Sequence, residues 1–122
     1  MARLTLSKLT ACGNFPTLQP AANSLDLPMV ATVVADKAQF VASGKDLVIV
    51  HNTDVGAQTF SITSVADPKN NRTGDITTYS LGAGEYAVVG PLYREGWMQT
   101  DGYIYLEAAH VGIKFGVVAL PQ

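Results

Sequence analysis

Cysteine, histidine and charge are all scarce in this chain. Its single cysteine, Cys12, excludes an internal disulfide, so packing and hydrogen bonds must hold the fold together. Charged residues make up 15% of the 122 residues, against about 25% in an average globular domain. A surface with so little charge has two explanations. Either it is buried against partners, or it belongs to a small β domain whose outer faces carry Thr, Ser, Asn and Gly.

Long basic and long apolar stretches are also missing. The eight Lys and Arg residues are scattered and the net charge is −2, whereas a nucleic-acid-binding surface needs a concentrated basic patch. No stretch approaches the ~20 apolar residues of a membrane-spanning helix, and residues 1–8 lack the apolar centre of a secretory signal. We therefore expect synthesis in the cytoplasm and neither a nucleic-acid nor a membrane partner.

The chain does contain a series of short segments rich in Val, Ile, Thr, Tyr and Phe, separated by turn residues. The clearest of them indicate strands at residues 45–50, 59–63, 76–81, 85–89, 103–107 and 113–118. Residues 29–34 and 38–42 are less clear; the second segment also fits a short helix, but we favour strands for both. A single domain of this length with this strand spacing predicts an all-β fold. We expect one antiparallel β-sandwich of jelly-roll type with an extended N-terminal arm.

Alternation of apolar and polar residues predicts which side chains face the core. The inward set is Leu47, Ile49, Phe60, Ile62, Ile76, Tyr86, Val88, Ile104, Leu106, Ile113, Phe115 and Val117. The residues that alternate with them on the outer face are Ser61, Tyr105, Glu107 and Lys114. Residues 81–85 contain two glycines, which supply positive φ in tight turns. We therefore expect residues 76–81 and 85–89 to form an antiparallel hairpin.

The first 28 residues differ in character from residues 29–122, which form the predicted sandwich domain. Residues 3–9 alternate like one strand, and the stretch after them holds three of the six prolines, which exclude a central strand or a helix interior there. We interpret residues 1–28 as an arm of one strand and an extended tether. A connection this long usually has a task in a compact domain. The arm either reaches a neighbouring copy by strand addition or folds back on its own sandwich.

Candidate chemical sites are few, and each has a simpler structural explanation. The loop 67–75 offers carboxylate and amide oxygens, but its spacing does not match a calcium loop and its residues suit a turn. His51 and His110 lack further ligands at a helpful spacing for zinc. The pattern Gly-x-Ser-x-Gly is absent, and the segment around Gly82 leads into a strand rather than a phosphate-binding helix. We expect no enzyme activity, no cofactor and no metal.

The loop 90–97 is the sharpest candidate for partner binding. It combines Tyr93, Arg94 and Trp97, the residue types most enriched at binding hot spots. Three interpretations remain open. Trp97 caps the open end of the sandwich, or the loop forms a protein interface, or Tyr93 and Trp97 form a stacking platform for a sugar.

Several motifs together resemble one family. They are Asn-Arg-Thr-Gly-Asp-Ile at 71–76, Leu-x-Ala-Gly-Glu at 81–85, Gly-Pro at 90–91, Gly-Trp at 96–97 and Asp-Gly-Tyr-Ile-Tyr-Leu at 101–106. Over residues 45–120, and more weakly in the arm, the chain resembles the head decoration (cement) proteins of tailed bacteriophages. These motifs are turns and strand starts rather than active-site residues, so the family has no shared catalytic residues to transfer.

The resemblance implies a homotrimer that binds the major capsid protein on the outside of the virion. It implies that the arm reaches the capsid or a neighbouring copy. A trimer that contacts several capsid subunits at once would stay bound through multivalency. Our expected partner-binding residues are Leu4, Leu6, Leu9, Phe15, Leu18, Arg72, Tyr93, Arg94 and Trp97. The alternatives are another virion part, such as a head–tail connector or a tail or fibre domain, and a carbohydrate-binding β-sandwich module.

Overall fold

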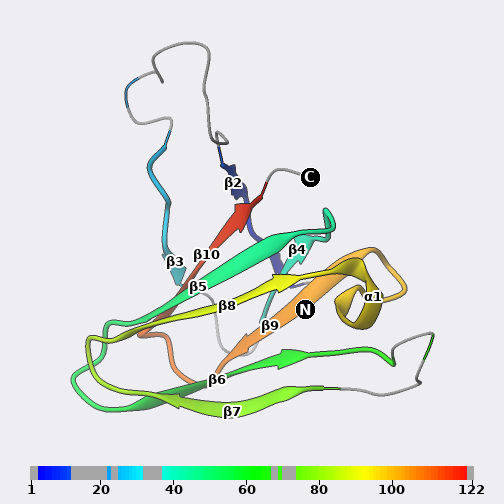
Figure 1. Cartoon of the computed structure of the whole chain (residues 1–122). Coiled ribbons are helices and arrows are strands. Elements are labelled where there is room, and N and C mark those ends of the chain that lie inside the picture. The colour runs from blue at the N-terminus through cyan, green and yellow to red at the C-terminus, as the bar shows by residue number, and fades with distance from the viewer. Residues whose placement is uncertain are drawn as a thin grey trace.

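The fold is known from a computed structural model that describes residues 3–11, 22, 25–31, 37–66, 69 and 74–120. Within them the chain is nearly all β (Figure 1). The elements are β1 (Leu4–Thr5), β2 (Lys8–Thr10), β3 (Val30–Ala31), β4 (Ala38–Val41), β5 (Asp46–Asn52), β6 (Gln58–Thr63), β7 (Ile76–Leu81), β8 (Tyr86–Leu92), α1 (Arg94–Trp97), β9 (Tyr103–Ala108) and β10 (Ile113–Ala119). The described residues hold no helix long and apolar enough to cross a membrane. The expected strands after residue 37 are confirmed, including a strand rather than a helix at 38–41. Of the expected strand at 29–34, residues 30–31 form β3 and residues 32–34 lie outside the described residues.

Two sheets of five strands pack against each other as a sandwich. The first sheet has the order β1-β4-β9-β6-β7; the second has the order β2-β10-β5-β8, with β3 also paired to β10. The pairs β1–β4 and β2–β10 are parallel, and the other described pairs are antiparallel. Both sheets are therefore mixed, and the expectation of a purely antiparallel sandwich was wrong. The parallel pairs arise because the arm adds one short strand to each sheet.

The core lies between the sheets and is built largely from the inward residues of five strands, β4, β5, β6, β9 and β10. Buried as expected are Phe60, Ile62, Ile104, Leu106, Ile113, Phe115 and Val117. The rings of Phe60 and Phe115 meet edge to face at 6.3 Å, a favoured arrangement for aromatic pairs. Ile76 is partly buried and packs against this cluster.

The inward face of β5 and β8 was predicted wrongly. Val48 and Val50 are fully buried, whereas Leu47 and Ile49 lie on the other face of β5. The side chains of Tyr86 and Val88 are 63% and 64% exposed. A continuous apolar run does not reveal which of its two faces is inward, because a shift by one residue exchanges them.

The connection 82–85 joins the two sheets and is not a hairpin turn. Strand β7 pairs with β6 in the first sheet, while β8 pairs with β5 in the second. The side chain of buried Asn52 holds this crossing in place by donating to the carbonyl oxygens of Leu81 at 2.9 Å and Gly82 at 3.3 Å. The predicted strands on either side are present, but they pair with different neighbours.

Candidate functional site

The N-terminal arm was expected to contact partners, and its described part lies against its own chain. Where one strand was expected, the structure has β1 on the first sheet and β2 on the second. Leu6, between them, is buried in the core, whereas Leu4 is 41% exposed. Leu9 is half-buried in β2, opposite Val118. Phe15 and Leu18 lie outside the described residues, so the role of the tether stays a prediction.

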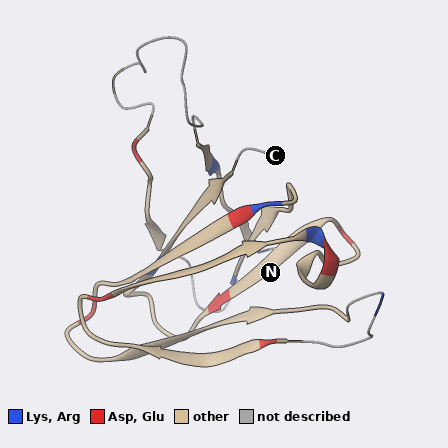
Figure 2. Cartoon of the chain, viewed as in Figure 1, with Lys and Arg blue, Asp and Glu red and all other residues tan. Residues whose placement is uncertain are grey.

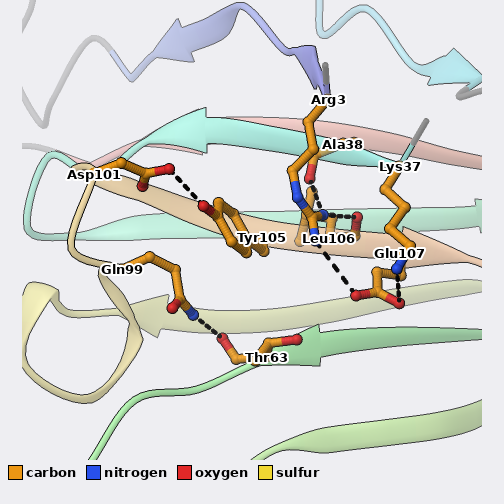
Figure 3. A network of polar contacts seen from close by, with 9 residues as sticks. All are labelled: Arg3, Lys37, Ala38, Thr63, Gln99, Asp101, Tyr105, Leu106 and Glu107. Atoms are coloured by element: carbon orange, nitrogen blue, oxygen red, sulfur yellow. Dashed lines mark hydrogen bonds and ion pairs between the residues drawn. The ribbon is translucent and has the colours of Figure 1, made fainter. Parts of the chain in front are cut away.

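Arg3 fastens the start of the arm to the first sheet (Figure 3). Its Nη1 donates to the carbonyl oxygens of Ala38 at 3.1 Å and Leu106 at 3.4 Å. Its Nη2 lies 3.6 Å from Oε2 of Glu107, and the guanidinium carbon stands 3.9 Å from the ring centre of Tyr105. A guanidinium stacked on an aromatic ring and paired with a carboxylate is a rigid, geometry-specific contact.

Lys8 fastens the next part of the arm at a more buried position. Its Nζ donates to the carbonyl oxygen of Val41 at 2.7 Å and lies 3.5 Å from Oδ1 of Asp46. Asp46 is fully buried and also accepts a hydrogen bond from the backbone N–H of Ser43 at 2.9 Å. A buried carboxylate needs such partners, because desolvation disfavours its charge.

The aromatic loop divides into a packed part and an exposed part. Trp97 is half-buried and packs against the core cluster, which favours the interpretation of this residue as a cap of the sandwich. Tyr93 is 52% exposed, and Arg94 is also exposed. The short helix α1 turns at Gly96, where φ is +94°, and the carbonyl oxygen of Gly96 accepts from the N–H of Val65 at 2.7 Å. Arg72 lies outside the described residues.

Both histidines make structural contacts. His51 stacks on Tyr86 with ring centres 3.9 Å apart, and Nδ1 of His110 accepts from the N–H of Gly112 at 2.9 Å. No group of three or more His, Cys, Asp or Glu side chains gathers in the described part of the chain at a spacing that would hold a metal. Most of the loop 67–75, with its candidate oxygen ligands, lies outside the described residues.

Three carboxyl groups are tuned by hydrogen bonds. The Ser64 side chain and its backbone N–H hold the pKa of Asp75 below its ordinary value. The side chain of Gln58 lowers the pKa of Asp54, and the Tyr105 hydroxyl lowers that of Asp101. The same contact with Asp101 raises the pKa of Tyr105. These contacts fasten turns and strand ends, as donors to a charged carboxylate do.

The outer face of the first sheet is polar. Its outward residues alternate with buried ones along the strands, and paired positions bring polar side chains side by side: Thr5, Gln39, Ser61, Thr63, Tyr105 and Glu107. Lys37 lies 3.5 Å from Glu107 on the same face. One face buried and one face polar is the usual arrangement of an antiparallel sheet.

The outer face of the second sheet is largely apolar, with His51 and Lys114 at one end, and the alternation pattern did not predict it. Ile49 pairs with Val88 on one side and with Gly116 on the other, and Leu47 pairs with Val118. Figure 2 shows how little charge these strands carry. The segment before β3 covers part of this face, because a Cβ on Gly116 would lie 2.6 Å from Sδ of Met29 and 3.0 Å from Cδ2 of Leu27. The continuous apolar runs in β5, β8 and β10 were the signal, since such runs are typical of strands buried on both faces.

No protein-family model, curated protein or solved structure matches this chain.

Proposed function

We propose that this chain is a structural protein of a tailed-phage virion. It is a decoration protein, made in the host cytoplasm, that binds the outer surface of major capsid subunits as a homotrimer and stabilises the head. The observation that carries the proposal is the apolar outer face of the second sheet. A sheet that is apolar on both faces is built to be covered on both, and the chain's own residues Leu27 and Met29 cover this face over Gly116. We infer that contact with other proteins covers the part of this face that Leu27 and Met29 leave open.

The strand order supports the jelly-roll form of the sandwich. Without the two arm strands, the sheets run β4-β9-β6-β7 and β3-β10-β5-β8. Successive strands from β3 to β10 cross between the sheets at each step except β6 to β7, as in two interlocked Greek keys. Jelly rolls are common in viral capsid proteins and in lectins. The fold is compatible with the proposed role, but function depends on surfaces rather than on topology.

The described residues of the motifs that carry the family resemblance lie in turns and strands of the sandwich. Gly90, for example, lies within β8 at the register shift against β5; its φ is +121°, and a Cβ there would lie 2.8 Å from the carbonyl oxygen of Asp46. Only glycine fits such a site. The resemblance therefore concerns the scaffold rather than an active site.

A decoration protein needs rigidity and several separate contacts. The sandwich supplies a stiff body, and the apolar face supplies contact area. Tyr93 and Arg94, which directly follow β8 in the sequence, add an exposed aromatic side chain and an exposed cation. Several modest contacts made at once give tight overall binding, because after the first contact the others form at high effective concentration.

Copy number in purified virions tests this proposal. Quantitative mass spectrometry should find the chain in particles at on the order of hundreds of copies, comparable to the major capsid protein, as occupancy over a whole shell requires. A copy number that matches one ring at the neck or tail would assign it to a connector or fibre. Absence from purified particles would refute a virion role.

A further inference from the structure

One edge of β10 is shared by two short strands from different parts of the chain. The other edge pairs with β5 along the whole of β10, from Ile113 to Ala119. On the shared edge, β3 pairs antiparallel with Lys114 and Phe115, and β2 pairs parallel with residues 117–119 (Figure 1). We call this edge at residues 117–119 the arm slot. Some feature of the chain must end β3 where the arm slot begins.

The residues just before β3 keep the side-chain alternation of a strand although they are not paired. Leu27 and Met29, two positions apart, both lie over Gly116 on the outer face, as alternate residues of one strand do. Continued one residue at a time, the register of β3 would place Met29 opposite Gly116 and Pro28 opposite Val117. This extension of β3 and the present position of β2 exclude each other, because both need the arm slot.

The backbone of β10 shows what a residue opposite Val117 has to supply. The N–H of Ala11, just after β2, donates to the carbonyl oxygen of Ala119 at 2.9 Å, so Ala119 turns its backbone groups toward the shared edge. These groups alternate along a strand, so Val117 turns its own the same way. An antiparallel partner there exchanges two hydrogen bonds with Val117, one of them through its own N–H. Pro28 has no N–H to donate.

We propose that the arm slot is a strand site with two competing occupants, and that Pro28 decides the competition in favour of the arm. In the structure β2 fills the slot, with Leu6 buried in the core and Lys8 beside Asp46 as further anchors. When the arm detaches, β3 extends over Val117 but lacks one of the two hydrogen bonds of a regular pair. An unpaired carbonyl group disfavours that pairing. This inference does not depend on a virion role.

The competition makes the arm a switchable element rather than a fixed strand. When the contacts of Arg3 and Lys8 with the body are broken, the pairs that β3 gains offset part of the loss. Release of the arm therefore costs less than the loss of its own contacts alone. Whatever binds the free arm shifts this equilibrium by the difference in its affinity for the two states.

Hydrogen exchange tests the role of Pro28. The amides of Leu9 and Ala11 face β10 in the arm slot, so they exchange when the arm detaches. Pro28→Ala restores the missing donor to the competing pairing. It should speed exchange at both amides by about 5-fold, the effect of one neutral hydrogen bond. Pro68→Ala makes the same change in the connection between β6 and β7 and should leave both rates unchanged.

Limited trypsin digestion gives a second, independent measurement. Cleavage after Lys8 requires the arm to detach, because its side chain is only 18% exposed and lies beside the buried carboxylate of Asp46. Cleavage of a transiently open segment follows the population of the open state. The initial rate of this cut, followed by mass spectrometry, should rise in Pro28→Ala by the same factor as the exchange rates.

The amide of Gly116 serves as the internal reference, because it points to β5 rather than to the arm slot. Faster exchange and cleavage in Pro28→Ala alone, with Gly116 unchanged, would support the inference. Unchanged rates in Pro28→Ala, or an equal rise in Pro68→Ala, would overturn it. A matching rise at Gly116 would show that the whole sheet loosens, and it would also overturn the inference. So would a Pro28→Ala protein that fails to fold, since a restored donor should not destabilise the sandwich.

Discussion

At the scale of single residues, Asn52 connects two separate turns of the fold. It is fully buried, and its amide donates to the carbonyl oxygens of Gly56 and Leu81, both at 2.9 Å. Its Oδ1 accepts from the N–H of Asp54 at 2.9 Å. One side chain thus hydrogen-bonds backbone groups in both the turn after β5 and the crossing from β7 to β8. Buried backbone groups at such a meeting point need a hydrogen-bond partner.

Replacing Asn52 with Ala should therefore be costly. The change leaves buried carbonyl groups unsatisfied, and we expect the free energy of unfolding to fall by about 2–4 kcal/mol. Urea denaturation followed by circular dichroism measures this. Thr53→Ala is the control: its hydroxyl donates to the carbonyl oxygen of Gly112 at 2.7 Å at an exposed site, so its loss should cost about 1 kcal/mol or less. Equal losses would contradict the role assigned to Asn52.

At the scale of elements, the arm strands β1 and β2 belong to the sandwich as the structure describes it. They extend both sheets, and Leu6 between them fills the core. Arg3 and Lys8 each tie one of these strands to carbonyl oxygens of the body. These strands pair with the body at only two and three positions, and such short pairings add little stability by themselves. The side chains of Arg3 and Lys8 must therefore supply much of the binding energy.

The two lysine ion pairs of this region predict different outcomes. Lys8→Met leaves the buried Asp46 carboxylate without its cation and should lower the free energy of unfolding by about 1–3 kcal/mol. Lys37→Met breaks a pair between side chains that are 44% and 33% exposed, and we expect a loss of about 0.5 kcal/mol or less. Chemical denaturation of both variants compares them. If the two losses are the same, Lys8 does not anchor the arm.

At the scale of the whole molecule, the free energy of unfolding should fall at low pH, because carboxylates hold several turns in place. Asp54, Asp75 and Asp101 all have a pKa below the ordinary value of 3.8 through hydrogen bonds to their charged form. A carboxyl whose pKa is lower in the folded state stabilises the protein above its unfolded pKa. That contribution is lost as the pH falls through the lowered value.

Asp75 offers the test of this acid dependence. Wild-type stability should decline as the pH falls below about 4, and Asp75→Asn should flatten part of that decline because the titrating group is gone. Ser64→Ala removes the hydroxyl donor to Asp75, and it should also make the decline of stability with falling pH less steep. Urea midpoints measured at a series of pH values give the comparison. An Asp75→Asn curve parallel to that of the wild type would show that this carboxyl does not contribute.

The order of amino acids by itself determined the β class, the positions of the strands and the inward faces of β6, β9 and β10. Alternating segments such as residues 59–63 have only one face that can be buried. Tertiary structure decided the rest. It placed Val48 and Val50 inward, sent β7 and β8 to different sheets and divided the arm between both. Where a strand is apolar on both faces, or a turn can join either sheet, local pattern is satisfied by more than one arrangement, and only packing of the whole chain selects between them.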